Sequence, residues 1–135
     1  MASLARLKRA RPGDMVRAAL ELGLARLCLD SRHSRAQVAA QSGPIVTLDE
    51  RQQMLAERVA FVIPRVAARL PWRADCLVQA LAAQRWLGRE GIATTLTLGV
   101  PKDKSAIFEA HAWLTAGERI VTGGDVSGYV PLARP

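Results

Sequence analysis

The sequence predicts an α+β domain in which helices come first and an antiparallel sheet follows. Two observations predict this class. Apolar residues recur at helical spacing as far as residue 90, and from residue 92 onward apolar and polar residues alternate with a period of two. The predicted strands follow one another through short turns, as in an antiparallel meander. We expect residues 1–70 to form a helical part with a basic N-terminal tail and residues 71–135 a core with the sheet, within one compact domain.

The first predicted helix spans residues 14–29, and Asp14 is placed to cap its N-terminus. Four apolar side chains at helical spacing form the stripe that we expect to face the core: Val16, Leu20, Leu24 and Leu27. Residues 30–44 are polar and rich in turn-forming residues, so we expect a loop or a weak helix there.

The second predicted helix spans residues 47–70. Thr47 and Glu50 have the spacing of a capping box. Pro64 lacks a backbone N–H and should kink or interrupt this helix, and Pro71 should end it. Its buried stripe is expected to comprise Leu55, Val59, Val62 and Val66.

The third predicted helix lies in "RADCLVQALAAQRWLGREG", residues 73–91. Asp75 can cap its start, and Gly91 can supply the left-handed residue after its end. Leu77, Leu81 and the alanine-rich face should be buried. Strands are expected at residues 92–100, 107–115 and 119–123, with a turn at 116–118 and a loop-like tail from residue 124.

Composition and charge bear on location and partners. No apolar run approaches the roughly 20 residues of a membrane span, and no secretory signal follows the basic N-terminus. We therefore expect a cytoplasmic protein with no stable membrane insertion, and two cysteines are too few for a disulfide framework. The net charge of +7 favours acidic partners. However, the arginines are scattered and no nucleic-acid-binding signature occurs, so we expect no nucleic-acid partner beyond weak binding that physiological salt abolishes.

One cysteine, one histidine and one aspartate are placed where a catalytic triad is possible. Cys76 falls in the first turn of the third helix, where unpaired N–H groups and the helix dipole favour a thiolate and can hold an oxyanion. His111 lies on the second strand and could accept the thiol proton. Asp125 follows the third strand, which returns the chain alongside His111, so its carboxylate could orient the imidazole. We expect neither a metal nor a cofactor.

Each of these residues also has a purely structural interpretation. A helical cysteine is often a small buried hydrophobe, and an aspartate after Gly-Gly is often a turn former. Taken alone, the residues favour this interpretation. Three further side chains also have both a functional and a structural interpretation. Trp72 could wall a substrate cleft or simply pack, Gln79 could polarise a carbonyl or lie at the surface, and Trp113 could shield the imidazole or belong to the core.

Two other residues could compete with the triad. Cys28 lies on an apolar face of the first helix, so we expect it to be buried and inert. Glu118 is an alternative to Asp125, but it lies in the predicted turn and should point to solvent.

Four segments favour the catalytic interpretation: "PWRADCLVQALAAQRWL", "GIATTLTLGV", "AHAWL" and "GGDVSGYVPLA". In combination they resemble the transglutaminase-like, papain-like cysteine peptidases, and more narrowly the leader peptidases of lasso-peptide biosynthesis. The resemblance covers residues 71–133 closely and residues 14–70 more loosely. It implies a helical N-terminal part followed by an antiparallel sheet, with Cys76 as nucleophile, His111 as general base and Asp125 as the residue that orients it.

The resemblance also implies an activity and its partners. The expected activity is removal of the leader from a ribosomally made lasso precursor peptide through a thioester intermediate. A separate small leader-recognition protein would present the precursor, and a lasso cyclase would close the macrolactam. Two alternatives stay open: a catalytically idle peptide-binding module, and another acyl transfer on the same triad, such as amide exchange or deamidation.

Overall fold

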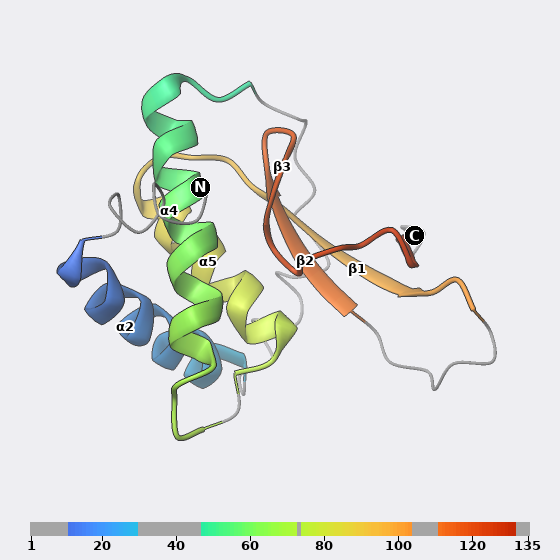
Figure 1. The fold of residues 1–135 in the computed structure, drawn as a ribbon, viewed down its shortest axis with the longest axis horizontal. Coiled ribbons are helices and arrows are strands. Elements are labelled where there is room, and N and C mark those ends of the chain that lie inside the picture. Colours follow the sequence, from blue (N-terminus) through green and yellow to red (C-terminus); the bar gives the residue numbers. More distant parts are fainter. Residues whose placement is uncertain (1–10, 30–46, 73, 104–110, 132–135) are drawn as a thin grey trace, which may run out of the picture.

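The computed structural model describes residues 11–29, 47–72, 74–103 and 111–131. Within them three helices precede four strands, so the predicted α+β order is confirmed (Figure 1). The helices are α2 (Pro12–Leu29), α4 (Glu50–Ala67) and α5 (Cys76–Arg89). The strands are β1 (Thr95–Pro101), β2 (His111–Ala116), β3 (Arg119–Thr122) and β4 (Tyr129–Pro131). The predicted basic tail, the predicted loop at 30–44 and the first part of the predicted strand at 107–115 lie outside the described residues.

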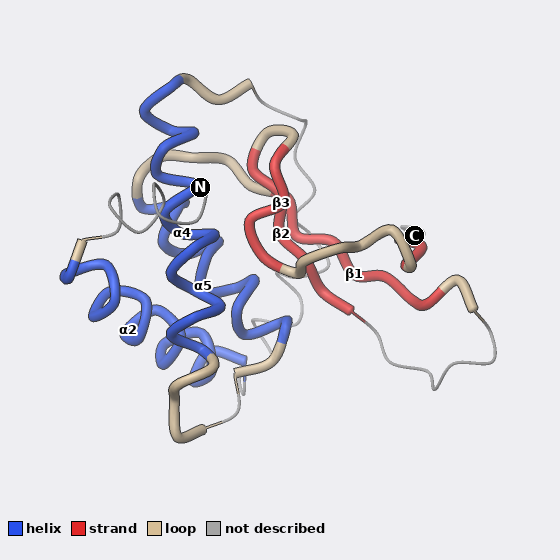
Figure 2. Tube along the Cα trace, in the orientation of Figure 1, coloured by secondary structure: helices blue, strands red, loops and turns tan. Residues whose placement is uncertain are grey.

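The helices gather on one side of the sheet, and α5 is the central element (Figures 1 and 2). It contacts both other helices and the strands β1, β2 and β3. The core therefore joins all three helices to one face of the sheet. Fully buried representatives are Leu22 of α2, Ile63 of α4, Leu87 of α5 and Leu114 of β2.

α5 and β2 run in the same direction, which brings their first residues to one end of the molecule. The chain leaves α5 at Arg89, reverses and enters β1, to which β2 is antiparallel. β2 therefore runs alongside α5, and Figure 2 shows both elements beginning on the same side. Cys76 is the first residue of α5, and His111 is the first residue of β2.

The sheet contains a strand that the sequence did not predict. Its order is β3-β2-β1-β4, with every neighbouring pair antiparallel. β4 lies in the tail that was expected to be a loop, so that prediction was wrong for Tyr129–Pro131. Three residues are too few to show alternation, and β4 forms because the chain returns to the far end of β1, where Val130 pairs with Val100.

α2 turns a different face to the core from the one that its apolar spacing predicts. Ala18, Leu22 and Ala25 are fully buried, whereas the predicted stripe is exposed: Val16 by 64%, Leu20 by 62%, Leu24 by 37% and Leu27 by 71%. That prediction was wrong because α2 carries two competing stripes, and the small side chains of Ala18 and Ala25 allow the closer approach to neighbouring helices.

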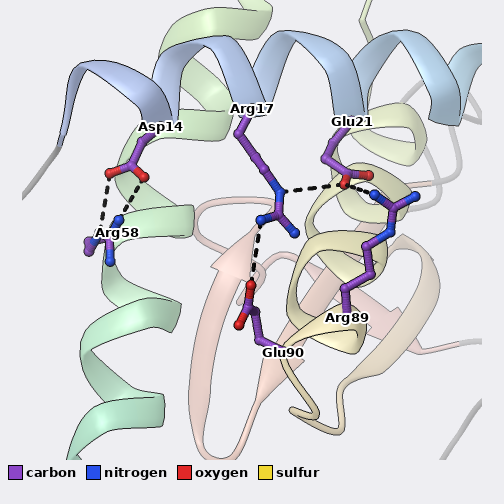
Figure 3. A network of polar contacts seen from close by, with 6 residues as sticks. All are labelled: Asp14, Arg17, Glu21, Arg58, Arg89 and Glu90. Atoms are coloured by element: carbon purple, nitrogen blue, oxygen red, sulfur yellow. Dashed lines mark hydrogen bonds and ion pairs between the residues drawn. The ribbon is translucent and has the colours of Figure 1, made fainter.

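The buried face of α2 also carries two charged residues, which ion pairs to the other helices compensate (Figure 3). Glu21 is only 1% exposed, and its carboxylate lies 3.2 Å from Arg89, 3.5 Å from Arg85 and 3.7 Å from Arg17. Arg17 also lies 3.5 Å from Glu90 at the end of α5. These contacts tie α2 to α5 by charge as well as by packing.

Asp14 forms the second pair and is not the N-cap that the sequence predicts. It lies inside α2, which begins at Pro12, and its two carboxylate oxygens accept hydrogen bonds of 2.6 and 3.2 Å from Arg58 of α4. The backbone N–H of Arg11 donates a third, of 2.8 Å. The carboxylate is thus fully engaged in holding α2 against α4.

α4 begins later than its sequence suggests. The capping box is formed by Asp49 and Gln52, not by Thr47 and Glu50. Pro64 lies inside α4 and does not interrupt it, because the helix continues to Ala67. No described helix is long and apolar enough to cross a membrane.

α5 is the element that the sequence predicts best. Asp75 caps its start by accepting a hydrogen bond of 3.1 Å from the Val78 N–H, and Gly91 follows its end with a φ of 76°. The alanine-rich face is buried as expected. Leu77 and Leu81 were expected to be buried and are partly buried, packed against the core.

Candidate functional site

Cys76 lies at the N-terminus of α5, where the local sequence holds both the helix start and the thiol in place. The Asp75 carboxylate accepts from Val78 N–H, and the Asp75 carbonyl accepts from Gln79 N–H at 3.0 Å. The Cys76 thiol is partly buried and packs against the edge of the core. In the described contacts the N–H groups of Cys76 and Leu77 keep no protein acceptor, so they remain as donors beside the thiol.

His111 is held by a backbone carbonyl. Its Nε2 lies 2.8 Å from the carbonyl oxygen of Gly123. A carbonyl can only accept, so Nε2 carries the proton and donates it to this bond. In the neutral imidazole Nδ1 is then the unprotonated atom, and it is the atom that could take a proton from a nucleophile.

An aromatic cluster packs around His111. The ring of Tyr129 stacks on the imidazole with centroids 4.7 Å apart and planes at 30°. Trp113 lies 6.0 Å from His111 and 6.3 Å from Tyr129, centroid to centroid. The tryptophan ring covers Gly99 of β1, where an added Cβ would lie 2.6 Å from it. Any larger residue than glycine at position 99 would therefore displace the ring that backs the imidazole.

Asp125 lies close to Gly123 and Tyr129 in sequence, but its carboxylate bonds to Ser127. Oδ1 accepts a hydrogen bond of 2.9 Å from the Ser127 N–H. The hydrogen bonds from the N–H and the hydroxyl of Ser127 hold the pKa of Asp125 below its usual value. Among the described contacts the hydrogen-bond partner of His111 is Gly123, and none joins His111 to Asp125.

The structure brings Cys76 and His111 to the same end of the α5–β2 pair but does not join them by a hydrogen bond between these described residues. Ala112 and Leu114 face the core, whereas His111 and Trp113 alternate with them on the other face of β2. The catalytic roles of Cys76, His111 and Asp125 stay predictions.

The other predicted side chains have the following surroundings. Gln79 is half-buried, and its amide donates to the Ala74 carbonyl at 3.0 Å, which ties α5 to the segment before it. Trp72 is half-buried, and its Nε1 is buried with no hydrogen-bond partner among the residues that the structure describes. Glu118 is exposed in the β2–β3 turn. Cys28 belongs to α2, but its side chain lies outside the described part of the structure.

Sequence reasoning missed Gly123 and Tyr129, which both contact the imidazole in the described part of the structure. Gly123 has a φ of 107°, and an added Cβ would lie 2.3 Å from Cβ of Trp113. The Gly-Gly pair before Asp125 is the one signal that could have indicated such a close approach. Tyr129 gave no signal, because its position depends on the pairing of β4 with β1.

Two hollows lie away from the start of α5. One, of about 490 Å³, lies between Thr47–Leu48 and the β2–β3 turn. The other, of about 1050 Å³, lies where the first turns of α2 and α4 meet the end of α5. Both lie at the far ends of β2 and α5 from His111 and Cys76, so neither is a cleft for this chemistry.

Comparison with known proteins agrees with the α+β fold. No curated protein and no solved structure shows significant similarity to the chain. The profile of the Transglutaminase-like superfamily matches residues 15–134, and this span includes all of α2 but its first three residues, α4, α5 and all four described strands. The chain therefore belongs to the Transglutaminase-like superfamily.

Proposed function

We propose that this chain is a thiol peptidase that removes the leader from a lasso-peptide precursor. Members of its superfamily are usually cysteine peptidases or acyl transferases, which supports the general kind of chemistry. The narrower substrate is supported by the resemblance of the segments around Cys76, His111 and Asp125 to the lasso-peptide leader peptidases. The observation that carries the proposal is that Cys76 begins α5 beside two N–H groups that have no protein acceptor among the described residues, while His111 begins β2 at the same end.

Acylation would begin with attack of the Cys76 sulfur on the scissile carbonyl carbon, which forms a carbon–sulfur bond. The N–H groups of Cys76 and Leu77 would hold the resulting oxyanion. His111 takes the thiol proton on Nδ1 and gives it to the amine of the leaving segment as the carbon–nitrogen bond breaks. The leader then remains attached to Cys76 as a thioester.

In deacylation a water molecule takes the place of the thiol as the proton donor to His111. His111 takes a proton from a water molecule, the water oxygen attacks the thioester carbon, and the carbon–sulfur bond breaks. The leader leaves with a free carboxyl group, and the proton returns to the thiol. His111 lies on the face of β2 opposite to the core face that α5 covers, so the proposal requires the imidazole to turn toward the start of α5 and approach the thiol when substrate is bound.

The decisive experiment is mass spectrometry of the precursor peptide after incubation with this protein and the separate leader-recognition protein. We expect one cut at the end of the leader, abolished in Cys76→Ala and kept in the matched variant Cys28→Ala. An uncut peptide, with binding to the partner demonstrated, would favour the idle binding module. A product that carries a new amide or has lost an amide nitrogen would favour the other acyl transfers.

Thiol reactivity gives a test that needs no substrate. We expect iodoacetamide at mild pH to alkylate Cys76 faster than Cys28, and His111→Ala to slow alkylation of Cys76 alone. Equal rates at both cysteines, insensitive to the histidine, would contradict a thiol–imidazole pair.

A further inference from the structure

α2 carries most of the exposed large apolar side chains in the part of the chain that the structure describes. Of eight such side chains, five lie on this helix: Met15, Val16, Leu20, Leu24 and Leu27. The last four recur at spacings of four, four and three residues, so they form one continuous stripe. The stripe lies opposite the fully buried Ala18, Leu22 and Ala25 and therefore faces outward. Single exposed apolar residues are ordinary, whereas a continuous apolar patch marks an interaction site.

Two glycines share this outward face of α2. An added Cβ at Gly13 or Gly23 would meet nothing within 4 Å among the described residues. The lack of side chains at these positions allows the backbone of another element to approach the helix closely. The outward face is therefore shaped for packing against protein.

The charged residues of α2 differ between its two faces. Asp14 and Glu21 are buried and pair with arginines of α4 and α5 (Figure 3). The exposed charged residues at the two ends of the stripe are both basic: Arg11, which immediately precedes the helix, and Arg26 in its last turn. The whole chain has a net charge of +7. Such a surface repels a second copy of itself and attracts an acidic protein.

We propose that the outward face of α2, defined by Val16, Leu20, Leu24 and Leu27, is a docking surface for a protein that presents an apolar groove bordered by acidic side chains. Under the proposed function this partner is the separate leader-recognition protein, and the inference rests on that function for the partner's identity. Two copies that met through this stripe alone would fall short of the roughly 20–30 residues that a stable interface uses on each side, whereas a groove also contacts the flanks of the helix.

This docking surface leaves the Cys76 thiol uncovered. The ion pairs of α2 reach Arg85, Arg89 and Glu90 in the last turns of α5, whereas Cys76 begins that helix. A partner bound to α2 can therefore hold the precursor near the peptidase while the cleavage site enters freely. Docking raises the effective concentration of the precursor, so it lowers KM and leaves kcat unchanged.

The test is isothermal titration calorimetry of this protein with the purified leader-recognition protein. Leu20 lies in the middle of the stripe and is 62% exposed, so its substitution leaves the fold intact. We expect Leu20→Glu to raise the Kd by at least about tenfold, because it removes an apolar contact and repels acidic side chains. Leu20→Arg removes the same contact but attracts those side chains, so its Kd should rise by no more than about threefold.

The matched control is Ile120→Glu, because Ile120 is 39% exposed and lies on β3 of the sheet. This variant should bind the partner as the parent does. Equal Kd values for the parent and Leu20→Glu, or weaker binding by Leu20→Arg than by Leu20→Glu, would overturn the proposal. If circular dichroism shows that Leu20→Glu does not fold, Leu27→Glu replaces it, since Leu27 is 71% exposed.

Two further measurements detect the other candidate occupants of this face. Sedimentation equilibrium of the chain alone detects a dimer, and flotation with vesicles of phosphatidylcholine and phosphatidylglycerol detects binding to an anionic bilayer. A dimer abolished by Leu20→Glu would assign the face to a second copy. Vesicle binding abolished by Leu20→Glu and retained by Leu20→Arg would assign it to a membrane. Either result would overturn the proposal.

Kinetics of leader cleavage separate the docking surface from the proposed function. With the partner present, Leu20→Glu should raise the KM for the precursor about as much as the Kd and leave kcat unchanged. If the parent cleaves the leader and Leu20→Glu binds and cleaves equally well, only the docking surface fails. If the parent binds the partner through α2 but cleaves no leader, the proposed function fails and the docking surface stands.

Discussion

Gly123 combines three constraints in one residue. Its φ of 107° favours glycine, its α-carbon faces Trp113 too closely for any side chain, and its carbonyl accepts a hydrogen bond from Nε2–H of His111. A substitution here would strain the backbone and push against the ring that lies beside the imidazole. The geometry of the candidate base is thus set by a residue that has no side chain.

We predict that Gly123→Ala lowers the free energy of unfolding by about 2–4 kcal/mol, the sum of a left-handed residue and an overpacked contact. Gly124→Ala is the matched control, because its φ is also positive, at 66°, but its added methyl would meet open space. In Gly124→Ala only the backbone strain of the positive φ should remain, and it should lower the free energy of unfolding by about 1 kcal/mol. Urea unfolding of both variants measures the difference, and equal losses would refute the contact with Trp113.

At the scale of the element, α2 and α5 show how far local sequence determines a helix. Both ends of α5 follow from residues within one turn of them, the side chain of Asp75 and the positive φ of Gly91, and both were predicted. The orientation of α2 follows instead from what lies across from it. Leu20 and Leu22 are equally apolar, yet Leu20 is 62% exposed and Leu22 is fully buried.

We predict that Leu22→Ala lowers the free energy of unfolding by about 2–5 kcal/mol, because it leaves a cavity in the core. Leu20→Ala should change it by less than about 0.5 kcal/mol, since the side chain is already largely in water. Thermal or urea unfolding of the pair checks this. A larger loss of unfolding free energy for Leu20→Ala than for Leu22→Ala would indicate that the face of α2 predicted from apolar spacing is the buried one.

At the scale of the whole molecule, charge joins the helical layer together. Burial raises the pKa of Asp14, but the hydrogen bond from Arg58, that from the Arg11 N–H and the charges of both arginines lower it more, so it lies below the usual 3.8. A carboxyl with a depressed pKa stabilises the folded state fully above its unfolded value. This contribution is lost as pH falls through the lower, folded value.

We predict that Asp14→Asn lowers the free energy of unfolding by about 2 kcal/mol at pH 7, the range of a hydrogen-bonded charge pair. The difference between parent and variant should shrink once the pH falls below about 4, because the parent carboxyl then also becomes neutral. Urea unfolding at several pH values measures both. A difference that stays constant down to pH 2 would contradict the linkage to Asp14.

The sequence by itself determined what depends on neighbours along the chain: the order of helices and strands, both ends of α5, the place of Cys76 on its first turn and of His111 on a strand. Caps and alternation act over a few residues, so they can be read locally. Tertiary structure decided which face of α2 is buried and which three arginines pair with Glu21. It also decided that Tyr129 begins a strand and that the Gly123 carbonyl accepts a hydrogen bond from His111. Each of these depends on groups from distant parts of the chain, whose meeting is fixed only when the core closes.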